Sequence, residues 1–205
     1  MKTNNYFKIL ASICVLLLIF TKNNATAQTY FNPKIGLHIS AIDGNFKDSV
    51  SLNSRVGWQI GLDIRKGSGI FFLNPGLHYK VTGIDLQKKV NTSGSIKDLT
   101  GQSTIQTLDL PINGGLFLTG KDQALLRIFV HGGVTPSYIV GIKSVDKFDL
   151  NPTEFNRFQL GVNAGVGIDL LFLNVGLNYE YYLMDYFKNQ PGKNRTISLN
   201  LGFVF

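Results

Sequence analysis

The feature that most constrains the fold is an alternation of apolar and polar residues that recurs eight times along the chain. In the final segment, 196–205, every second residue is Ile, Leu or Phe, and mostly small or polar residues lie between them. Side chains of a β-strand point alternately to opposite faces, so this segment has one apolar face and one mostly polar face. Seven further segments repeat the pattern, at about 34–39, 55–65, 70–82, 103–118, 124–140, 157–170 and 173–181.

Amphipathic strands of roughly ten residues have the length that crosses a bilayer at a tilt. Their number is even, as in single-chain bacterial barrels, and the connections alternate between short and long, as periplasmic turns and outward loops do. Short connections are expected at 66–69, 119–123 and 170–172, and long ones at about 42–54, 83–102, 141–155 and 185–194. We therefore predict an all-β fold: an eight-stranded antiparallel up-and-down transmembrane β-barrel with both termini in the periplasm.

A soluble lipocalin-like barrel is the rival interpretation, because it also has strands with one apolar face. The positions of the glycines favour the membrane barrel. Ten glycines share the parity of the polar face: Gly57, Gly61, Gly76, Gly115, Gly133, Gly161, Gly165, Gly167, Gly176 and Gly202. Small residues are useful where a narrow eight-stranded barrel must enclose its side chains, so the polar face is predicted to be the inside.

The same polar face carries charges of both signs: Arg55, Arg65, Lys80, Arg127 and Arg157 with Asp63, Asp109, Asp169 and Glu180. Buried charges must be paired and hydrogen-bonded. An eight-stranded barrel is just wide enough for side chains to fill it. The pattern therefore predicts an interior plugged by ion pairs; a narrow small-solute channel is the alternative.

The amino terminus has the pattern of a secretory signal peptide. A basic region precedes an apolar run at 9–20, and Ala25-Thr26-Ala27 provides a cleavage pattern before Gln28. The run is shorter than the about 20 residues of a membrane-spanning helix. The chain's single cysteine, Cys14, is a poor lipoprotein site, because Ile13 precedes it and the apolar run continues beyond it. The expected domains are a signal peptide at 1–27 and an outer-membrane barrel at 28–205.

Removal of that peptide would lower the formal net charge from +7 to +4, because Lys2, Lys8 and Lys22 leave without any acid. The high pI is thus partly a targeting signal, and the sequence has no basic cluster typical of nucleic-acid binding. Nucleic acid is accordingly not an expected partner.

Two strands are expected to be irregular and one to close the barrel. Ile105 interrupts the alternation, which predicts a β-bulge near Gln106. Pro136 cannot donate to a strand ladder and marks a second local irregularity. The final strand, ending at Phe205, is expected to close against 34–39.

The region after the signal peptide resembles the PorT-like outer-membrane β-barrel family of Bacteroidetes. The resemblance rests on Leu108-Asp109-Leu110-Pro111-Ile112, on His131-Gly132-Gly133, on the glycine repeat at 161–167 and on the terminal aromatic strand. It implies a Gram-negative outer-membrane location, and the family's named member belongs to a protein-secretion apparatus, which allows a secretion-accessory role. By resemblance to other outer-membrane barrels, the terminal aromatic would be read by the barrel assembly machinery.

No catalytic, cofactor-binding or metal-binding residues are predicted, and the protein is expected not to be an enzyme. His38, His78 and His131 share the parity of the polar face with Ser40, Ser137 and Asp109, but no nucleophile or zinc motif occurs. A lipid-modifying outer-membrane enzyme is the least favoured alternative.

The expected partners are outer-membrane lipid and, through the polar connection at 83–102, a protein or surface ligand. Loops on rigid scaffolds often carry binding, and this one contains Lys88, Lys89 and Lys97. The leading hypothesis is an integral outer-membrane barrel with a structural, surface-binding or secretion-accessory role.

Overall fold

The computed structural model describes residues 28–43, 50–54, 56–92, 95–120, 124–144, 155–186, 188 and 192–205. The expected signal peptide with Cys14, and also Arg55, lie outside the described residues. The strands are β1 (Gln28–Asp43), β2 (Val50–Ser54), β3 (Val56–Ser68), β4 (Phe71–Thr92), β5 (Ser95–Asp109), β6 (Ile112–Thr119), β7 (Leu126–Ser144), β8 (Phe158–Leu170), β9 (Leu173–Asp185) and β10 (Lys193–Phe203). Among the described residues, no helix is long and apolar enough to cross a membrane.

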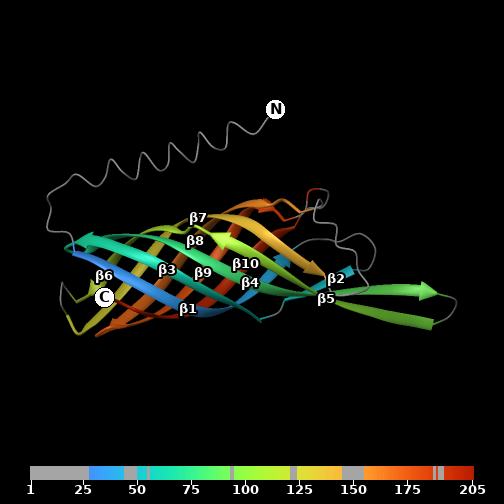
Figure 1. The fold of residues 1–205 in the computed structure, drawn as a ribbon, viewed down its shortest axis with the longest axis horizontal. Coiled ribbons are helices and arrows are strands. Elements are labelled where there is room, and N and C mark those ends of the chain that lie inside the picture. Colours follow the sequence, from blue (N-terminus) through green and yellow to red (C-terminus); the bar gives the residue numbers. More distant parts are fainter. Residues whose placement is uncertain are drawn as a thin grey trace, which may run out of the picture.

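These strands form one antiparallel sheet that closes on itself (Figure 1). The order around the barrel is β3, β1, β10, β9, β8, β7, then β5 followed by β6, then β4, which pairs with β3. Because β5 and β6 share one position in the wall and β2 extends the position of β3, the barrel has eight strands around its circumference. The predicted fold class is therefore confirmed.

The last strand closes the barrel against the first. The register runs from Lys34 opposite Gly202 to Asp43 opposite Lys193, which confirms the pairing expected for 34–39. Beyond the ladder, the backbone of Phe31 and Phe205 exchanges two hydrogen bonds of 3.0 Å. The C-terminal residue is thus held in the wall of the barrel.

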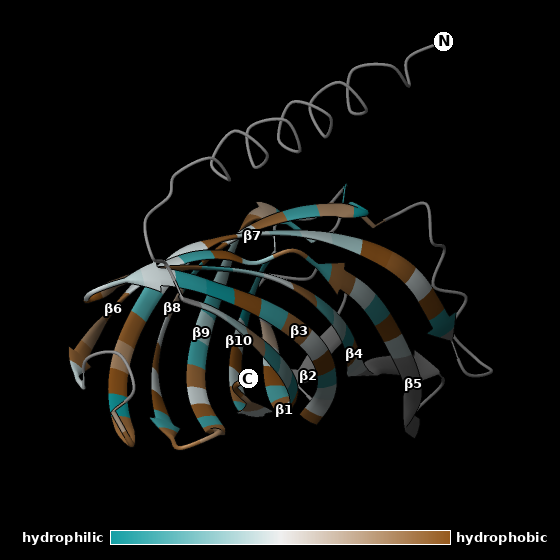
Figure 2. Cartoon of the chain, turned by 60° about the vertical axis from the view of Figure 1, so that its left-hand side comes forward, coloured by the Kyte–Doolittle hydropathy of each residue, from teal (hydrophilic) through white to brown (hydrophobic). Residues whose placement is uncertain are grey.

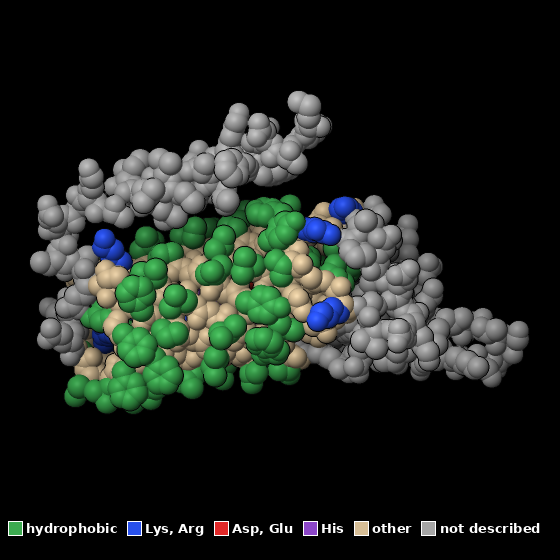
Figure 3. Space-filling view, in the orientation of Figure 1, with side chains coloured by type: hydrophobic (Ala, Val, Ile, Leu, Met, Phe, Trp, Pro, Cys, Tyr) green, Lys and Arg blue, Asp and Glu red, His purple; other side chains and the backbone are tan. Residues whose placement is uncertain are grey.

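The outside of the barrel is apolar around its middle. On β10, residues 197, 199, 201 and 203 are each about half exposed, and the same alternation is visible along the other strands (Figure 2). Figure 3 shows hydrophobic side chains covering the middle of the barrel and Lys and Arg side chains at its two ends. Such a band, bordered by polar ends, is the surface that a bilayer covers.

The two ends of the barrel differ. The short β3–β4, β6–β7 and β8–β9 connections and the C-terminus lie at one end, here named the turn end. At the opposite end, named the loop end, β7 and β9 end, β8 and β10 begin, and the β4–β5 hairpin projects from the barrel wall (Figure 1).

That hairpin corrects the prediction of a loop at 83–102. β4 and β5 remain paired from Gly83 opposite Thr104 to Thr92 opposite Ser95, and β2 pairs with β4 over Ile84–Lys88. Ile84 and Leu86 alternate with Asp85 and Gln87, so the period of two continues past the expected end of the strand. The polar composition concealed this periodicity.

Both predicted irregularities lie at one place in the wall. The β5–β7 register shifts between Gln106 and Thr107, at the predicted place, but the extra residue is Val140 of β7. β5 itself keeps its alternation, because Ile105 is an apolar residue that faces the interior with Asp109. β7 runs through Pro136 without a register shift against β8, and the irregularity lies on its other side. There the Leu110 N–H donates to the Pro136 carbonyl at 2.8 Å, where β5 ends and β6 begins.

Candidate functional site

The interior of the barrel is the candidate site, and its glycines allow dense packing. A Cβ atom on Gly61 would overlap the His78 ring, and one on Gly167 would overlap the Phe129 ring. The same kind of overlap with an interior side chain occurs at Gly36, Gly57, Gly76, Gly115, Gly165 and Gly202. Interior side chains thus lie directly against bare backbone, as the parity of the glycines predicted.

At the turn end, one carboxylate binds two guanidinium groups. Arg65 donates from Nη1 to Asp169 Oδ2 at 2.6 Å, and Arg127 Nη2 lies 3.0 Å from the same oxygen. Asn174 donates to the other oxygen, Oδ1, at 2.6 Å. All three charged side chains are almost fully buried, so this cluster ties β3, β7 and β8 together across the interior.

Aromatic rings surround these guanidinium groups. The Arg65 guanidinium lies 4.4 Å from the ring centroid of Phe129 and 5.0 Å from that of Phe72. Arg127 lies 5.1 Å from the centroid of Phe117, which itself packs against Phe72 at 5.0 Å. Cation–π contacts are strongest where water is excluded, so these rings stabilise the buried guanidinium groups. The same rings fill the interior at the turn end.

Asp63 organises the next layer. It accepts hydrogen bonds from the Lys34 ammonium and, at 2.8 Å, from Asn74 Nδ2. Its other oxygen lies 2.6 Å from Nε2 of His78. The carboxylate is buried and meets one donor from β1 and two from β4, which satisfies its lone pairs.

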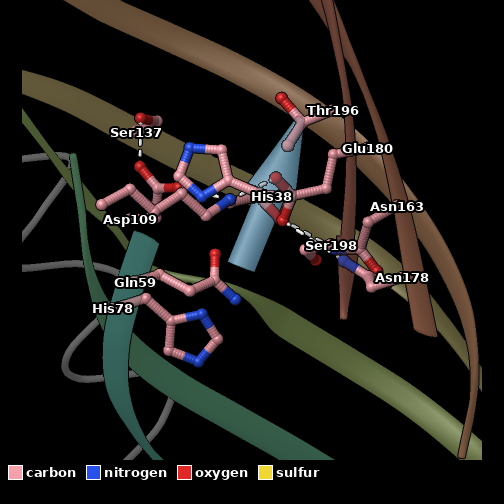
Figure 4. Close-up of polar contacts among 12 residues, drawn as sticks. His38, Gln59, His78, Asp109, Ser137, Asn163, Asn178, Glu180, Thr196 and Ser198 are labelled. Carbon is pink, nitrogen blue, oxygen red and sulfur yellow. Dashed lines mark hydrogen bonds and ion pairs between the residues drawn. The ribbon is translucent and has the colours of Figure 1, made fainter. Parts of the chain in front are cut away.

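Lys80 organises the layer nearer the loop end. Its ammonium lies 2.9 Å from Asp109 Oδ2 and also pairs with Glu180. Ser137 donates to Asp109, and the Tyr182 hydroxyl lies 3.4 Å from both Asp109 and Glu180. Figure 4 shows polar side chains from separate strands, including Asp109, Ser137 and Glu180, pointing toward one another inside the barrel.

Apolar and aromatic side chains cover the loop end of this interior. Phe155 and Tyr186 are buried, with ring centroids 5.8 Å apart, and Ile105 and Ile139 are buried on β5 and β7. The pKa of the Tyr186 phenol is raised because burial disfavours the phenolate. The interior thus has aromatic residues at both ends and ion pairs between them.

The charges of the interior balance. Among the described residues its ion pairs join four cations to four acids: Lys34, Arg65, Lys80 and Arg127 with Asp63, Asp109, Asp169 and Glu180. A cavity of about 30 Å³ lies among Gln59, Asn74, Asn113 and His131. This volume suits about two water molecules, which could satisfy the amide and imidazole atoms around it that have no protein partner.

The three histidines occupy the polar face as predicted but do not form one centre. Each ring has a different partner: Thr82 at 2.9 Å for His38, Asp63 at 2.6 Å for His78 and Asn178 at 3.2 Å for His131. Ser40 hydrogen-bonds to Thr196, and Ser137 to Asp109. Within the described part of the chain, no three His, Cys, Asp or Glu side chains are grouped as metal ligands would be.

One predicted interior charge lies elsewhere, and several interior residues were missed. Arg157 is exposed at the loop end, because β8 begins only at Phe158 and no wall encloses the residue before it. The missed interior residues include Phe72, Ile105, Phe129, Ile139 and Tyr182. Each shares the parity of its polar neighbours, so parity rather than polarity would have found them.

A closed antiparallel barrel with an apolar outer band and a filled polar interior defines an integral outer-membrane β-barrel protein. The family described as outer membrane protein beta-barrel domain matches residues 24–188, and the chain belongs to this family. No curated protein matches the sequence.

The solved structures of two outer-membrane proteins show the same fold at low sequence identity. The Neisserial surface protein A is 9% identical, with a TM-score of 0.51, over 88% of this chain and 100% of that one. The outer membrane protein OprG from Pseudomonas aeruginosa is 10% identical, with a TM-score of 0.55, over 87% of this chain and 96% of that one. The outer membrane enzyme PagL is 13% identical, with a TM-score of 0.47, over 82% and 97%.

Proposed function

We propose that this protein is a non-conducting outer-membrane barrel that serves as a rigid scaffold for binding at the cell surface. The observation that carries the proposal is the interior, in which four cations and four acids are paired and packed between aromatic residues. A pore selects ions by rings of like charge or by a continuous polar path. The balanced, filled interior offers neither.

Conductance in planar bilayers tests this proposal against the small-solute channel. The folded protein, inserted in a bilayer, is expected to give no single-channel steps. Insertion is checked separately by the heat-dependent gel migration of protein recovered from the same vesicles. This check ensures that failed insertion is not mistaken for a non-conducting barrel. Clear, reproducible steps from correctly inserted protein would establish the channel instead.

We propose further that the barrel is not catalytic. His78 and Ser137, the groups most suited to acid–base or nucleophilic chemistry, both engage buried carboxylates, and the neighbouring cavity of about 30 Å³ is far smaller than a lipid. A lipid-modifying reaction needs such groups at a surface that lipid can reach. Incubation with purified outer-membrane lipid followed by mass spectrometry is expected to show no product. A product that disappears in His78→Ala or His131→Ala would support the enzyme instead.

The turn end and both termini are proposed to face the periplasm, with the β4–β5 hairpin at the cell surface. Short turns on one side and long connections on the other support this orientation. Cysteine introduced as Ser68→Cys marks the turn end, and Thr92→Cys marks the hairpin. A membrane-impermeant maleimide applied to whole cells is expected to label the hairpin variant only. Labelling of Ser68→Cys alone would show that the turn end faces the cell surface and would contradict the proposed orientation.

The part of the hairpin beyond Lys88 is the proposed binding surface. Its removal can be designed without changing the barrel, because the pairs from Lys89–Asp98 to Thr92–Ser95 can be deleted together while Ser93 and Gly94 are kept. β2 keeps its pairing with β4 in that variant. A surface partner cross-linked to the intact protein is expected to be lost, while heat-dependent migration stays unchanged. Equal cross-linking in both proteins would exclude the hairpin.

We also propose a PorT-like identity within the family, with a secretion-accessory role, and assembly by the barrel assembly machinery. The support is the segment 108–112, whose Pro111 lies at the break between β5 and β6, and the terminal strand that closes the barrel. Deletion of the gene in its own host is expected to reduce the amount of secreted protein; an unchanged secretome would exclude this role.

A further inference from the structure

We propose that exposed cations at the loop end form a binding site for the phosphate groups of outer-leaflet glycolipid. The described cations there are Lys143, Arg157, Lys188, Lys193 and Arg195, and all five are exposed. Figure 3 shows Lys and Arg side chains next to the apolar band at this end. These residues are named here the basic rim.

The basic rim lies on neighbouring strands. Lys143 ends β7, Arg157 precedes β8, Lys188 follows β9, and Lys193 begins β10, and these four strands are adjacent in the barrel wall. The cations therefore occupy one continuous arc. An arc of positive charge, unlike scattered surface lysines, can bind one multiply charged headgroup or several adjacent ones.

The height of the rim matches the polar edge of a bilayer. Arg157 is adjacent to Phe158, which is half exposed in the apolar band, and Lys143 lies three residues beyond the exposed Val140. At about 3.3 Å per residue along a strand, the rim begins within about 10 Å of the last apolar side chains. Lipid phosphates lie at that depth, just outside the hydrocarbon.

Four cations of the basic rim lack the acidic partners that every interior cation has. Among the described residues, Lys143, Arg157, Lys188 and Lys193 form no ion pair. Lys193 lies opposite Asp43 in the β1–β10 ladder and opposite Asp185 in the β9–β10 ladder. The exposed Asp185 accepts the Gly192 N–H at 3.2 Å. The positive charge of the arc is therefore available to an external anion.

Aromatic side chains lie immediately below the rim. The Lys193 ammonium lies 5.8 Å from the ring centroid of Tyr181. Tyr138, opposite Phe158 in the β7–β8 ladder, is about half exposed. Such rings prefer the interface between hydrocarbon and headgroups. A sugar–phosphate headgroup would thus meet cations above and aromatic faces below.

The turn end provides a comparison within the same molecule. Among its described residues, the outward-facing cation is Lys66, at the other edge of the apolar band. A general requirement for interface lysines would place cations similarly at both edges. The larger number of exposed cations at the loop end favours contact of this end with the leaflet that carries phosphorylated glycolipid. The assignment of the loop end to that leaflet rests on the proposed orientation of the barrel.

Native mass spectrometry of the folded protein in detergent tests the site. The probes are bisphosphorylated lipid A and lipid A from which both phosphates have been removed. The variant combines Lys143→Gln, Arg157→Gln, Lys188→Gln and Lys193→Gln, and Lys66→Gln is the matched control. Because each basic residue near an anionic lipid surface contributes about a fivefold factor, the variant is expected to bind bisphosphorylated lipid A at least about tenfold more weakly.

The native protein and Lys66→Gln are expected to bind the bisphosphorylated probe equally and to prefer it to the dephosphorylated one. Equal binding of the two probes, or undiminished binding by the fourfold variant, would overturn the proposal. Heat-dependent gel migration of each variant shows whether the barrel is folded. This test does not depend on the orientation of the barrel in the membrane. A failure of the phosphate site is thereby distinguished from a failure of the barrel assignment.

Discussion

Arg65 on β3 donates to Asp169 on β8 at 2.6 Å, across the interior from one wall of the barrel to the other. The two residues are 104 positions apart in the chain, and three strands separate β3 from β8 in either direction around the wall. The pair is almost fully buried and sits among the rings of Phe72 and Phe129. The interior is therefore a brace that joins opposite walls.

Replacement of the shared carboxylate is expected to destabilise the barrel strongly. Asp169→Ala leaves Arg65 and Arg127 buried without their common acid. Breaking a buried pair costs about 3–5 kcal/mol, because an uncompensated charge remains. Urea unfolding in lipid vesicles measures the free energy of unfolding. Asp185→Ala, which removes an exposed carboxylate, is the control and should change it by less than about 1 kcal/mol. Equal effects of the two substitutions would contradict the bracing role.

Two adjacent glycines on β6 should respond differently to the same substitution. A Cβ on Gly115 would overlap the Phe72 ring and lie 2.7 Å from the Val130 carbonyl oxygen, whereas one on Gly114 meets nothing within 4 Å. Overpacking of this kind costs about 1–3 kcal/mol. Gly115→Ala is therefore expected to lower the free energy of unfolding and Gly114→Ala to leave it nearly unchanged. A comparable loss in both variants would show that the interior is not closely packed there.

A charge on the apolar band should be costly only in the middle of the bilayer. Leu199 lies at the centre of β10 and Leu171 lies in the β8–β9 turn, and both are more than half exposed. An arginine on the lipid-facing side costs about 2–4 kcal/mol at the midplane and about 0–1 near the interfaces. Leu199→Arg should thus destabilise the barrel in vesicles far more than Leu171→Arg. The opposite order would mean that the membrane crosses the barrel at a different height.

The terminal aromatic should matter for assembly more than for stability. The contacts of Phe205 with Phe31 are made by backbone atoms, so Phe205→Ala preserves both hydrogen bonds. Refolding in detergent is expected to be nearly normal, while the amount of folded barrel in cell outer membranes falls severalfold. Leu201→Ala, an equally outward residue of the same strand, is the control. Normal cellular levels of Phe205→Ala would exclude this residue as an assembly signal.

Alternation in the sequence was enough to predict which residues face inward along most of each strand. It placed Asp63, Asp109, Asp169 and Glu180 inside, and it predicted an irregularity near Gln106, although the extra residue lies on β7. It failed where hydrophobicity was used in place of parity, because Phe72 and Phe129 are interior residues of apolar character. It also failed at 83–102, where a hairpin continues without the strong apolar face that the membrane requires of the rest.

The sequence by itself determined the class of architecture, the two faces of each strand and the strand that closes the barrel. Side chains alternate between the two faces of a strand, and a bilayer requires the outer face of a barrel to be apolar. These two constraints determine which face of each strand points outward. Only the tertiary structure decided which charges meet, such as Arg65 and Arg127 on one oxygen of Asp169, and which cations remain outside as the basic rim. Partners across a closed barrel depend on the register and tilt of all its strands together, and no local pattern carries that information.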